Sequence, residues 1–170
     1  SRPLPVMMVV GASNRLPEDD SLGALFDRFL MRVRCDNVPG ERLGEVLEAG
    51  WKLDLQIEMD RASVGVGEIH RLHALLPQVD LSAVRAAHID LVARLRKAGI
   101  AISDRRAVKL QRLVAASAIL CGRQKAVVSD LWVFRHIWDT EEQREVLAAQ
   151  VAEAIGKAGE EPDAHPRARG

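Results

Sequence analysis

The stretch MMVVGASN, residues 7–14, decides the fold of the N-terminal part of this chain. It opens with an apolar run that does not alternate with polar residues, and Gly11 and Ser13 interrupt it. A short apolar run that ends in Gly and Ser is typical of a strand buried on both faces of a parallel sheet. We therefore predict a strand at Val6–Val10, with a polar amide, Asn14, at its carboxyl end.

Residues 1–38 continue with the pattern of an α/β layer. Acidic residues precede a predicted helix, Ser21–Arg28, because the positive end of a helix favours negative charge. Phe29–Cys35 is predicted as a second strand. Two strands cannot close a parallel sheet, and a lone pair of strands is marginal in water. We therefore expect residues 1–38 to be the end of a larger sheet domain whose other strands are encoded upstream, and a first residue, Ser1, other than Met fits this expectation.

Beyond Pro39–Gly40 the pattern is helical, and we predict an all-α domain over residues 39–158. The tail, residues 159–170, is polar and without period, and is predicted to be disordered. The expected helices are Glu41–Ala49, Val66–Leu76, Leu81–Lys97, a long helix capped by Ser103 and ended by Gly122, a helix capped by Ser129 that runs through Ile137, and a last helix from a Thr140-x-x-Gln143 capping box to Lys157.

Composition and charge narrow the class of protein. The 24 basic and 24 acidic side chains cancel, and apolar residues make up 48% of the chain. This balance indicates a globular protein that binds neither nucleic acid nor an anionic membrane surface. No apolar run approaches the roughly 20 residues of a membrane span. Cys35 and Cys121 lack C-x-x-C spacing, so we expect reduced core thiols and a cytoplasmic protein.

Asn14 and Arg28 are candidate catalytic residues, and each has an ordinary alternative. Ligands of open α/β sheets bind at the carboxyl ends of the strands, where an amide can orient an attacking water. An Asn at that place is also a common turn residue. Arg28 either compensates the helix dipole and pairs with Asp27, or acts as an arginine finger on a phosphoryl group bound to a neighbouring subunit.

The sequence SDRR places two guanidinium groups in the first turn of a predicted helix. That end of a helix is positive, so Arg105 and Arg106 are unfavourable there unless an anion binds in front of them. The preceding aspartate offsets part of this charge. Arg105 also shares a helix face with Lys109 and Arg112, so an ordinary solvated basic stripe is the alternative interpretation.

Together these residues match a known constellation. From Leu4 to about Ile155 the chain resembles the MoxR family of AAA+ ATPases, and most closely its regulatory-ATPase-variant (RavA-like) branch. The long first segment is quite specific, whereas SDRR alone would not be. The segments that carry the resemblance are VVGASNRLPEDDSLGALFDRFLMRV, ISDRRAVKLQRLVAASAILCGR and VVSDLWVFRHIWDTEEQREVL.

The resemblance implies a role for each candidate residue. Asn14 matches sensor 1 at the end of the fourth strand of the ATPase core, and Arg28 matches the trans-acting arginine finger. Arg105 matches sensor 2, on the lid helix that closes over the nucleotide. Arg106, about 100° further round that helix, is expected to be an ordinary surface or interface residue. Arg15 departs from the acidic residue expected after sensor 1, which leaves the role of that position open.

The resemblance also implies the architecture and activity of the intact protein. Residues 1–38 would be the C-terminal part of the parallel AAA+ core sheet, and residues 39–158 its helical lid with a family-specific extension. The protein would hydrolyse ATP with Mg²⁺ in a homo-oligomeric ring, commonly a hexamer, and would remodel client proteins. A protein with a von Willebrand factor A domain is the partner that the resemblance suggests.

The sequence lacks the G-x-x-x-x-G-K-[ST] loop and an apolar strand ending in paired acids. These motifs supply the phosphate cradle, its lysine and the Mg²⁺ ligands, so we expect this chain alone to be inactive. A different class of hypothesis is a stand-alone helical interaction module without catalysis. An upstream phosphate-binding loop would discriminate between the two.

Two other patterns carry less weight. His70 and His73 lie on one helical face as half of a metal site, but no nearby Cys or carboxylate completes a four-ligand set. Trp51, Trp132 and Trp138 are expected to be core or subunit-contact aromatics rather than platforms for stacked bases, given the neutral charge.

Overall fold

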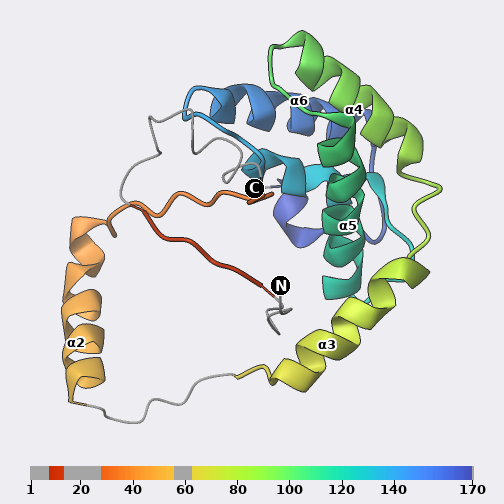
Figure 1. The fold of residues 1–170 in the computed structure, drawn as a ribbon. Coiled ribbons are helices and arrows are strands. Elements are labelled where there is room, and N and C mark those ends of the chain that lie inside the picture. Colours follow the sequence, from red (N-terminus) through yellow and green to blue (C-terminus); the bar gives the residue numbers. More distant parts are fainter. Residues whose placement is uncertain (1–7, 14–27, 56–62, 170) are drawn as a thin grey trace, which may run out of the picture. The chain divides into compact units, whose positions relative to one another are not determined.

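The structure is a computed structural model, and it describes residues 8–13, 28–55 and 63–169 (Figure 1). Its contacts divide the chain into two units, Ser1–Leu30 and Met31–Gly170. All the helices among the described residues belong to the second unit. The α-helices (α) and 3-10 helices (η) follow one another along the chain as η2 (Gly40–Arg42), α2 (Leu43–Asp54), α3 (Val66–Leu75), η3 (Leu76–Gln78), α4 (Arg85–Lys97), α5 (Asp104–Leu120), η4 (Val128–His136), α6 (Gln143–Ala158) and η5 (Pro166–Arg169).

The core of the second unit lies where α4, α5 and α6 pack with η4. Apolar residues recur at helical spacing on the buried faces, so each helix contributes one stripe to this core. Burying one such side chain stabilises the fold by about 1.5–3 kcal/mol. This packing fits the all-α lid that the sequence predicts. Fully buried apolar residues are Leu91, Leu95, Leu110, Val114, Leu131, Phe134, Ile137, Leu147 and Val151.

The ends of α4 and α5 follow the predicted signals. Ser103 is the N-cap of α5, and its Oγ accepts a hydrogen bond from the N–H of Arg106 at 3.1 Å. Gly99 and Gly122 follow the ends of α4 and α5 with φ of 85° and 70°. Only a residue without Cβ adopts this left-handed conformation readily, so these two glycines end the helices where predicted.

Helix α2 is longer than predicted. It runs past Ala49 and Gly50 to Asp54, although a glycine inside a helix costs about 1 kcal/mol. An ion pair between Glu48 and Lys52, with Nζ and Oε1 2.6 Å apart, spans the glycine on the helix surface. The apolar stripe of α2 is exposed in the structure. Its residues are Leu43, Val46, Leu47 and Trp51.

Two predicted caps differ from the structure. Ser129 does not cap an α-helix, because the segment is the 3-10 helix η4 and Asp130 Oδ2 accepts the N–H of Val127 at 2.9 Å. Helix α6 begins at Gln143, two residues later than the capping box with Thr140 as N-cap predicts, and its N-cap is Glu142. The Oε1 of Gln143 accepts the N–H of Asp139 at 2.8 Å, one residue before the predicted cap, Thr140.

The described residues contain no named strand, and one isolated parallel bridge joins Asp80 and Lys125. Part of the predicted strand Val6–Val10 lies outside the described residues. Phe29–Cys35 is irregular backbone, and the N–H of Arg32 donates to the carbonyl of His136 at 2.7 Å rather than to another strand. The α/β sheet therefore stays a prediction.

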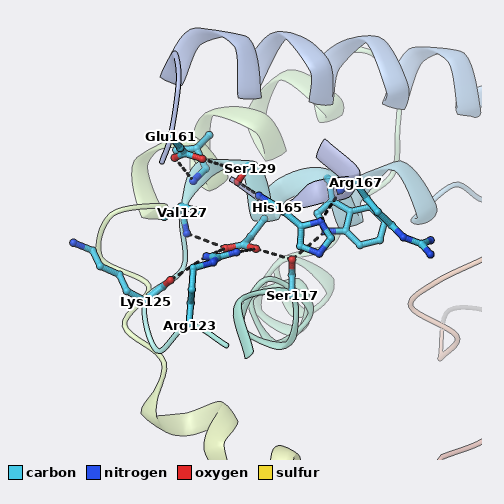
Figure 2. Close-up of polar contacts among 11 residues, drawn as sticks. Ser117, Arg123, Lys125, Val127, Ser129, Glu161, His165 and Arg167 are labelled. Carbon is cyan, nitrogen blue, oxygen red and sulfur yellow. Dashed lines mark hydrogen bonds and ion pairs between the residues drawn. The ribbon is translucent and has the colours of Figure 1, made fainter. Parts of the chain in front are cut away.

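The C-terminal tail is described through residue 169 and packs against η4, while the disorder of residues 159–170 stays a prediction. Glu161 accepts the N–H groups of Val128 and Ser129 at 2.8 and 2.9 Å through its two carboxylate oxygens. The N–H of His165 donates to Ser129 Oγ at 2.9 Å, and Figure 2 shows these contacts side by side. These bonds satisfy the free amides at the start of η4, which explains why a polar segment packs there.

Both cysteines are free thiols, as predicted. Cys121 is half-buried, but Cys35 is exposed and is not the core thiol that the sequence predicts. Within residues 31–35 the side chains face solvent except that of Arg32. This segment is therefore held to the helices by the side chain and backbone of Arg32 and by an exposed ion pair between Arg34 and Glu141.

Candidate functional site

The three predicted site residues do not share one described unit of the chain. Asn14 lies outside the described residues. Arg28 is exposed and belongs to the unit Ser1–Leu30. Arg105 is exposed in the first turn of α5 and belongs to the other unit.

Arg105 has a free guanidinium group. No hydrogen bond or ion pair joins it to any residue in the described part of the chain. The neighbouring Asp104 does not neutralise it, because the carboxylate of Asp104 accepts from Arg96 Nη2 at 2.7 Å. An unpaired cation therefore stands at the positive end of α5, which is the arrangement that favours a bound anion.

Arg106 is buried, and the prediction that it is an ordinary surface or interface residue is wrong. Its side chain is 7% exposed and its Nη1 lies 2.8 Å from Oδ2 of Asp139. Its Nη2 donates to the carbonyl of Ile137 at 2.7 Å and to Asp139 Oδ1 at 3.2 Å. The missed signal is the helical period: Arg106 precedes the core residue Leu110 by four positions and so lies on the buried stripe of α5.

Asp139 also pairs with a second arginine from a distant part of the sequence. Arg32 Nη1 donates to Asp139 Oδ1 and to the carbonyl of Trp138, both at 2.7 Å. We call Arg32, Arg106 and Asp139 the Asp139 cluster. Its two arginines also donate to carbonyls that follow η4, where the helix dipole favours positive charge.

A fully buried carboxylate, that of Asp130, organises the opposite end of η4, and Figure 2 labels its partners Ser117, Arg123 and Val127. Asp130 is 0% exposed, and Arg123 pairs with both of its oxygens at 2.7 Å. Ser117 Oγ donates to Asp130 Oδ1 at 2.6 Å, and Trp132 Nε1 donates to the same hydroxyl at 3.0 Å. The hydrogen bonds and charge of Asp130 raise the pKa of Arg123. We call Ser117, Arg123 and Asp130 the Asp130 cluster.

The tryptophans have three different environments. Trp138 is buried in the core, as predicted. Trp132 is half-buried and stacks on the ring of His165, with centroids 4.8 Å apart. Trp51 is exposed on α2.

The predicted half metal site gains no further ligands among residues 8–13, 28–55 and 63–169, where no group of three or more His, Cys, Asp or Glu is placed to bind a metal ion. His73 Nε2 lies 3.1 Å from Arg112 Nη2, which joins α3 to α5. The described helices also include none with the length and apolar character needed to cross a membrane.

Comparison with known proteins gives two family matches that together run through most of the chain. Residues 1–74 match the family described as the MoxR domain in the MoxR-vWA-beta-propeller ternary systems. Residues 83–151 match an AAA lid domain, and this range contains α4, α5, η4 and the start of α6.

Two relatives come from Methanocaldococcus jannaschii. The chain is 31% identical to uncharacterized protein MJ0079 over 159 residues, which cover 93% of this chain and 41% of that protein. It is 35% identical to uncharacterized protein MJ0812 over 137 residues, which cover 79% of this chain and 35% of that protein. The chain thus spans about two fifths of the length of the curated relatives it matches.

The family matches agree with the geometry of the second unit. The lid match covers both the free Arg105 and the buried Arg106 on α5, and the MoxR match covers Asn14 and Arg28. The chain thus carries a match to a MoxR domain over residues 1–74 and a match to an AAA lid domain over residues 83–151.

Proposed function

We propose that this chain supplies the nucleotide-sensing and lid parts of an ATPase that couples ATP hydrolysis in a homo-oligomeric ring to chaperone-like remodelling of client proteins. The MoxR and lid matches support the ATPase, and the remodelling follows from the family resemblance. ATP bound with Mg²⁺ supplies the phosphoanhydride that is cleaved. This sequence contains no phosphate-binding loop. We propose that this loop and the Mg²⁺ ligands lie upstream in the intact protein.

The observation that carries this proposal is the contrast between the two arginines of α5. Arg105 is exposed and has no ion pair with another described residue, whereas both terminal nitrogens of Arg106 are bonded, to Asp139 and to the carbonyl of Ile137. A free guanidinium beside the open amides of a capped helix fits a phosphate oxygen. We therefore assign sensor 2 to Arg105.

Asn14 and Arg28 complete the proposed site as sensor 1 and the arginine finger. Asn14 would orient the attacking water, and Arg28 would neutralise charge on the phosphoryl group bound by a neighbouring subunit. The MoxR match over residues 1–74 supports both assignments. Exposure of Arg28 is consistent with a side chain that acts in trans.

The description of the MoxR match names MoxR-vWA-beta-propeller ternary systems, which supports a partner with a von Willebrand factor A domain. We propose a ring, commonly a hexamer in the resembled family, because an arginine finger needs a neighbouring subunit. We further propose a cytoplasmic protein of the RavA-like branch, on the segments quoted from the sequence.

Nucleotide titrations of the full-length protein test the role of Arg105. A charge-assisted contact to the γ-phosphate is worth roughly 1.5–3 kcal/mol, so Arg105→Ala should weaken ATP binding by about 10- to 100-fold and ADP binding much less. The matched control is Lys109→Ala, one turn further along the same face of α5, which should leave both affinities nearly unchanged. Equal losses for ATP and ADP at Arg105 would contradict the assignment.

A second candidate function is a non-catalytic helical interaction module. The exposed apolar stripe of α2 favours it, because apolar residues at helical spacing bind other proteins when they stay uncovered. ATP hydrolysis by the full-length protein, lost on Arg28→Ala, would exclude this alternative. Absence of hydrolysis in the presence of Mg²⁺ would favour it.

A further inference from the structure

We propose that Asp139 is a positioning residue that couples the first turn of α5, which carries Arg105, to the segment that follows Arg28. The proposal rests on the proposed function, because it assigns the nucleotide sensor to Arg105 and the finger to Arg28. Asp139 itself would touch no nucleotide. It would act through the two arginines that share its carboxylate.

The carboxylate of Asp139 is divided between two guanidinium groups. Oδ2 accepts from Arg106 Nη1 at 2.8 Å, and Oδ1 accepts from Arg32 Nη1 at 2.7 Å and from Arg106 Nη2 at 3.2 Å. The side chains of Arg32 and Arg106 are 11% and 7% exposed, so this charge is screened by little water. Because one carboxylate stabilises both cations, the position of each arginine depends on the position of the other.

The backbone makes the same connection. The N–H of Arg32 donates to the carbonyl of His136, while the side chains of Arg32 and Arg106 donate to the carbonyls of Trp138 and Ile137. Three successive carbonyls, from the last residue of η4 to Trp138, are thus held by the same two arginines. A shift of η4 relative to α5 would break bonds to both, so the three segments are expected to move as one.

The sequence places this cluster next to both proposed functional arginines. Arg106 is the direct neighbour of Arg105 on α5, and Arg32 follows Arg28 by four residues. A nucleotide contact that displaces the first turn of α5 would therefore also act on the segment that begins at Arg32. In the proposed ring this would link the γ-phosphate bound in one subunit to the finger that the same subunit offers to its neighbour.

Arg34 provides a matched control in the same segment. It pairs with Asp36 and with Glu141 of the helical part, with contacts of 2.6 and 2.9 Å. Its side chain is 47% exposed, however, and it makes no contact with Asp139. Exposed pairs of this kind contribute about 0–1 kcal/mol, so loss of Arg34 should leave the segment in place.

Steady-state kinetics of the full-length protein test the coupling. Arg32→Ala should lower kcat by roughly 10- to 100-fold, since displacement of a catalytic group by about 1 Å has effects of this size. The KM for ATP should change less than about threefold, because Arg105 and Arg106 stay in place. Arg34→Ala should keep the wild-type kcat. Arg32→Lys should recover most of the loss, because an ammonium group in the place of Arg32 Nη1 can donate to both Asp139 Oδ1 and the carbonyl of Trp138.

A double-variant experiment separates coupling from general destabilisation. Asp139→Asn and Arg32→Ala break the same link, so combining them should lower kcat no further than the stronger single change does. Wild-type kcat for folded Arg32→Ala, equal losses for Arg32→Ala and Arg34→Ala, or additive losses in the double variant would each overturn the proposal. If Arg32→Ala does not fold, failure of Arg32→Lys to keep at least a third of the wild-type kcat would overturn it. Absence of hydrolysis in the wild-type protein would instead overturn the proposed function.

Discussion

The Asp130 cluster and the Asp139 cluster lie at the two ends of η4, and they differ in the segments of the chain that they connect. The Asp130 cluster is local: Ser117, Arg123 and Val127 lie within 13 residues of the carboxylate they bond. The Asp139 cluster joins residues separated by 107 and 33 positions, and its carboxylate is 28% exposed rather than fully buried. A cluster whose residues are close in sequence and whose carboxylate is fully buried stabilises one part of the fold. A partly exposed carboxylate that two arginines share can change partners. We therefore assign a role in stability to the Asp130 cluster and a role in coupling to the Asp139 cluster.

Asp130→Ala should give the largest loss of stability. The change leaves Arg123 without its partner in a buried site, and breaking such a pair costs about 3–5 kcal/mol. The free energy of unfolding can be measured with urea by following the fluorescence of Trp132 and Trp138, which lie in this unit. Ser117→Ala, which removes the hydrogen bonds to Asp130 and Trp132 and leaves the ion pair, should cost about 2 kcal/mol. Equal costs for the two variants would contradict the role in stability that we assign to the Asp130 cluster.

Arg106→Ala should destabilise less, by about 2 kcal/mol, because Asp139 keeps Arg32 and part of its surface remains in water. The loss should weaken ATP and ADP binding alike, since a less stable lid serves both nucleotides equally. Titration of both nucleotides checks this against Arg105→Ala, which should weaken ATP binding much more than ADP binding. If Arg106→Ala instead weakened ATP binding selectively, Arg106 rather than Arg105 would be the nucleotide sensor.

Glu161→Ala should cost about 1 kcal/mol, the usual effect of removing a side chain that caps the start of a helix. Glu161 accepts the N–H groups of Val128 and Ser129, so its loss should also speed hydrogen exchange at these two amides. The adjacent Glu160 is exposed and makes no ion pair with the described residues, which makes Glu160→Ala the control. Unchanged exchange in Glu161→Ala would show that the tail does not cap η4.

Protonation of the histidines as the pH falls should have the smallest effect on the free energy of unfolding. Burial lowers the pKa of His88, although a hydrogen bond to the backbone of Ala107 opposes this. The folded state therefore favours the neutral ring, and its contribution is complete above the unfolded pKa of about 6.5 and declines as pH falls towards the lower folded value. Burial lowers the pKa of His136 and His165 as well, so all three act in the same direction. Between about pH 7.5 and about pH 5.5, the free energy of unfolding should fall less in His88→Gln than in the wild type. The same dependence of this free energy on pH in both proteins would contradict the prediction.

Sequence patterns predict the local features of this molecule well. The stripe through Leu110 and Val114, the Ser103 cap and the glycine at the end of α5 are all set by neighbours within a few positions. Arg106 was missed because an arginine is usually a surface residue, even though its spacing from Leu110 places it on the buried stripe.

Such local sequence patterns do not predict contacts between distant segments of the chain. Asp139 gives no sign in the sequence that Arg32 and Arg106 will share it, because their pairing depends on how three segments pack. The packing of the tail on η4 gives no sign in the sequence for the same reason: Glu161 and His165 have no period of their own and take their places from the free groups of η4.

The exposed thiol of Cys35 makes the segment after Arg32 open to direct observation. Cys35 follows Arg32 by three residues, and the other cysteine, Cys121, is half-buried. With Cys121 replaced by alanine, a fluorescent maleimide on Cys35 would place a dye beside the segment held by the Asp139 cluster. Its polarisation would then follow the order of that segment through the nucleotide cycle, in real time and without a change to any residue of the cluster.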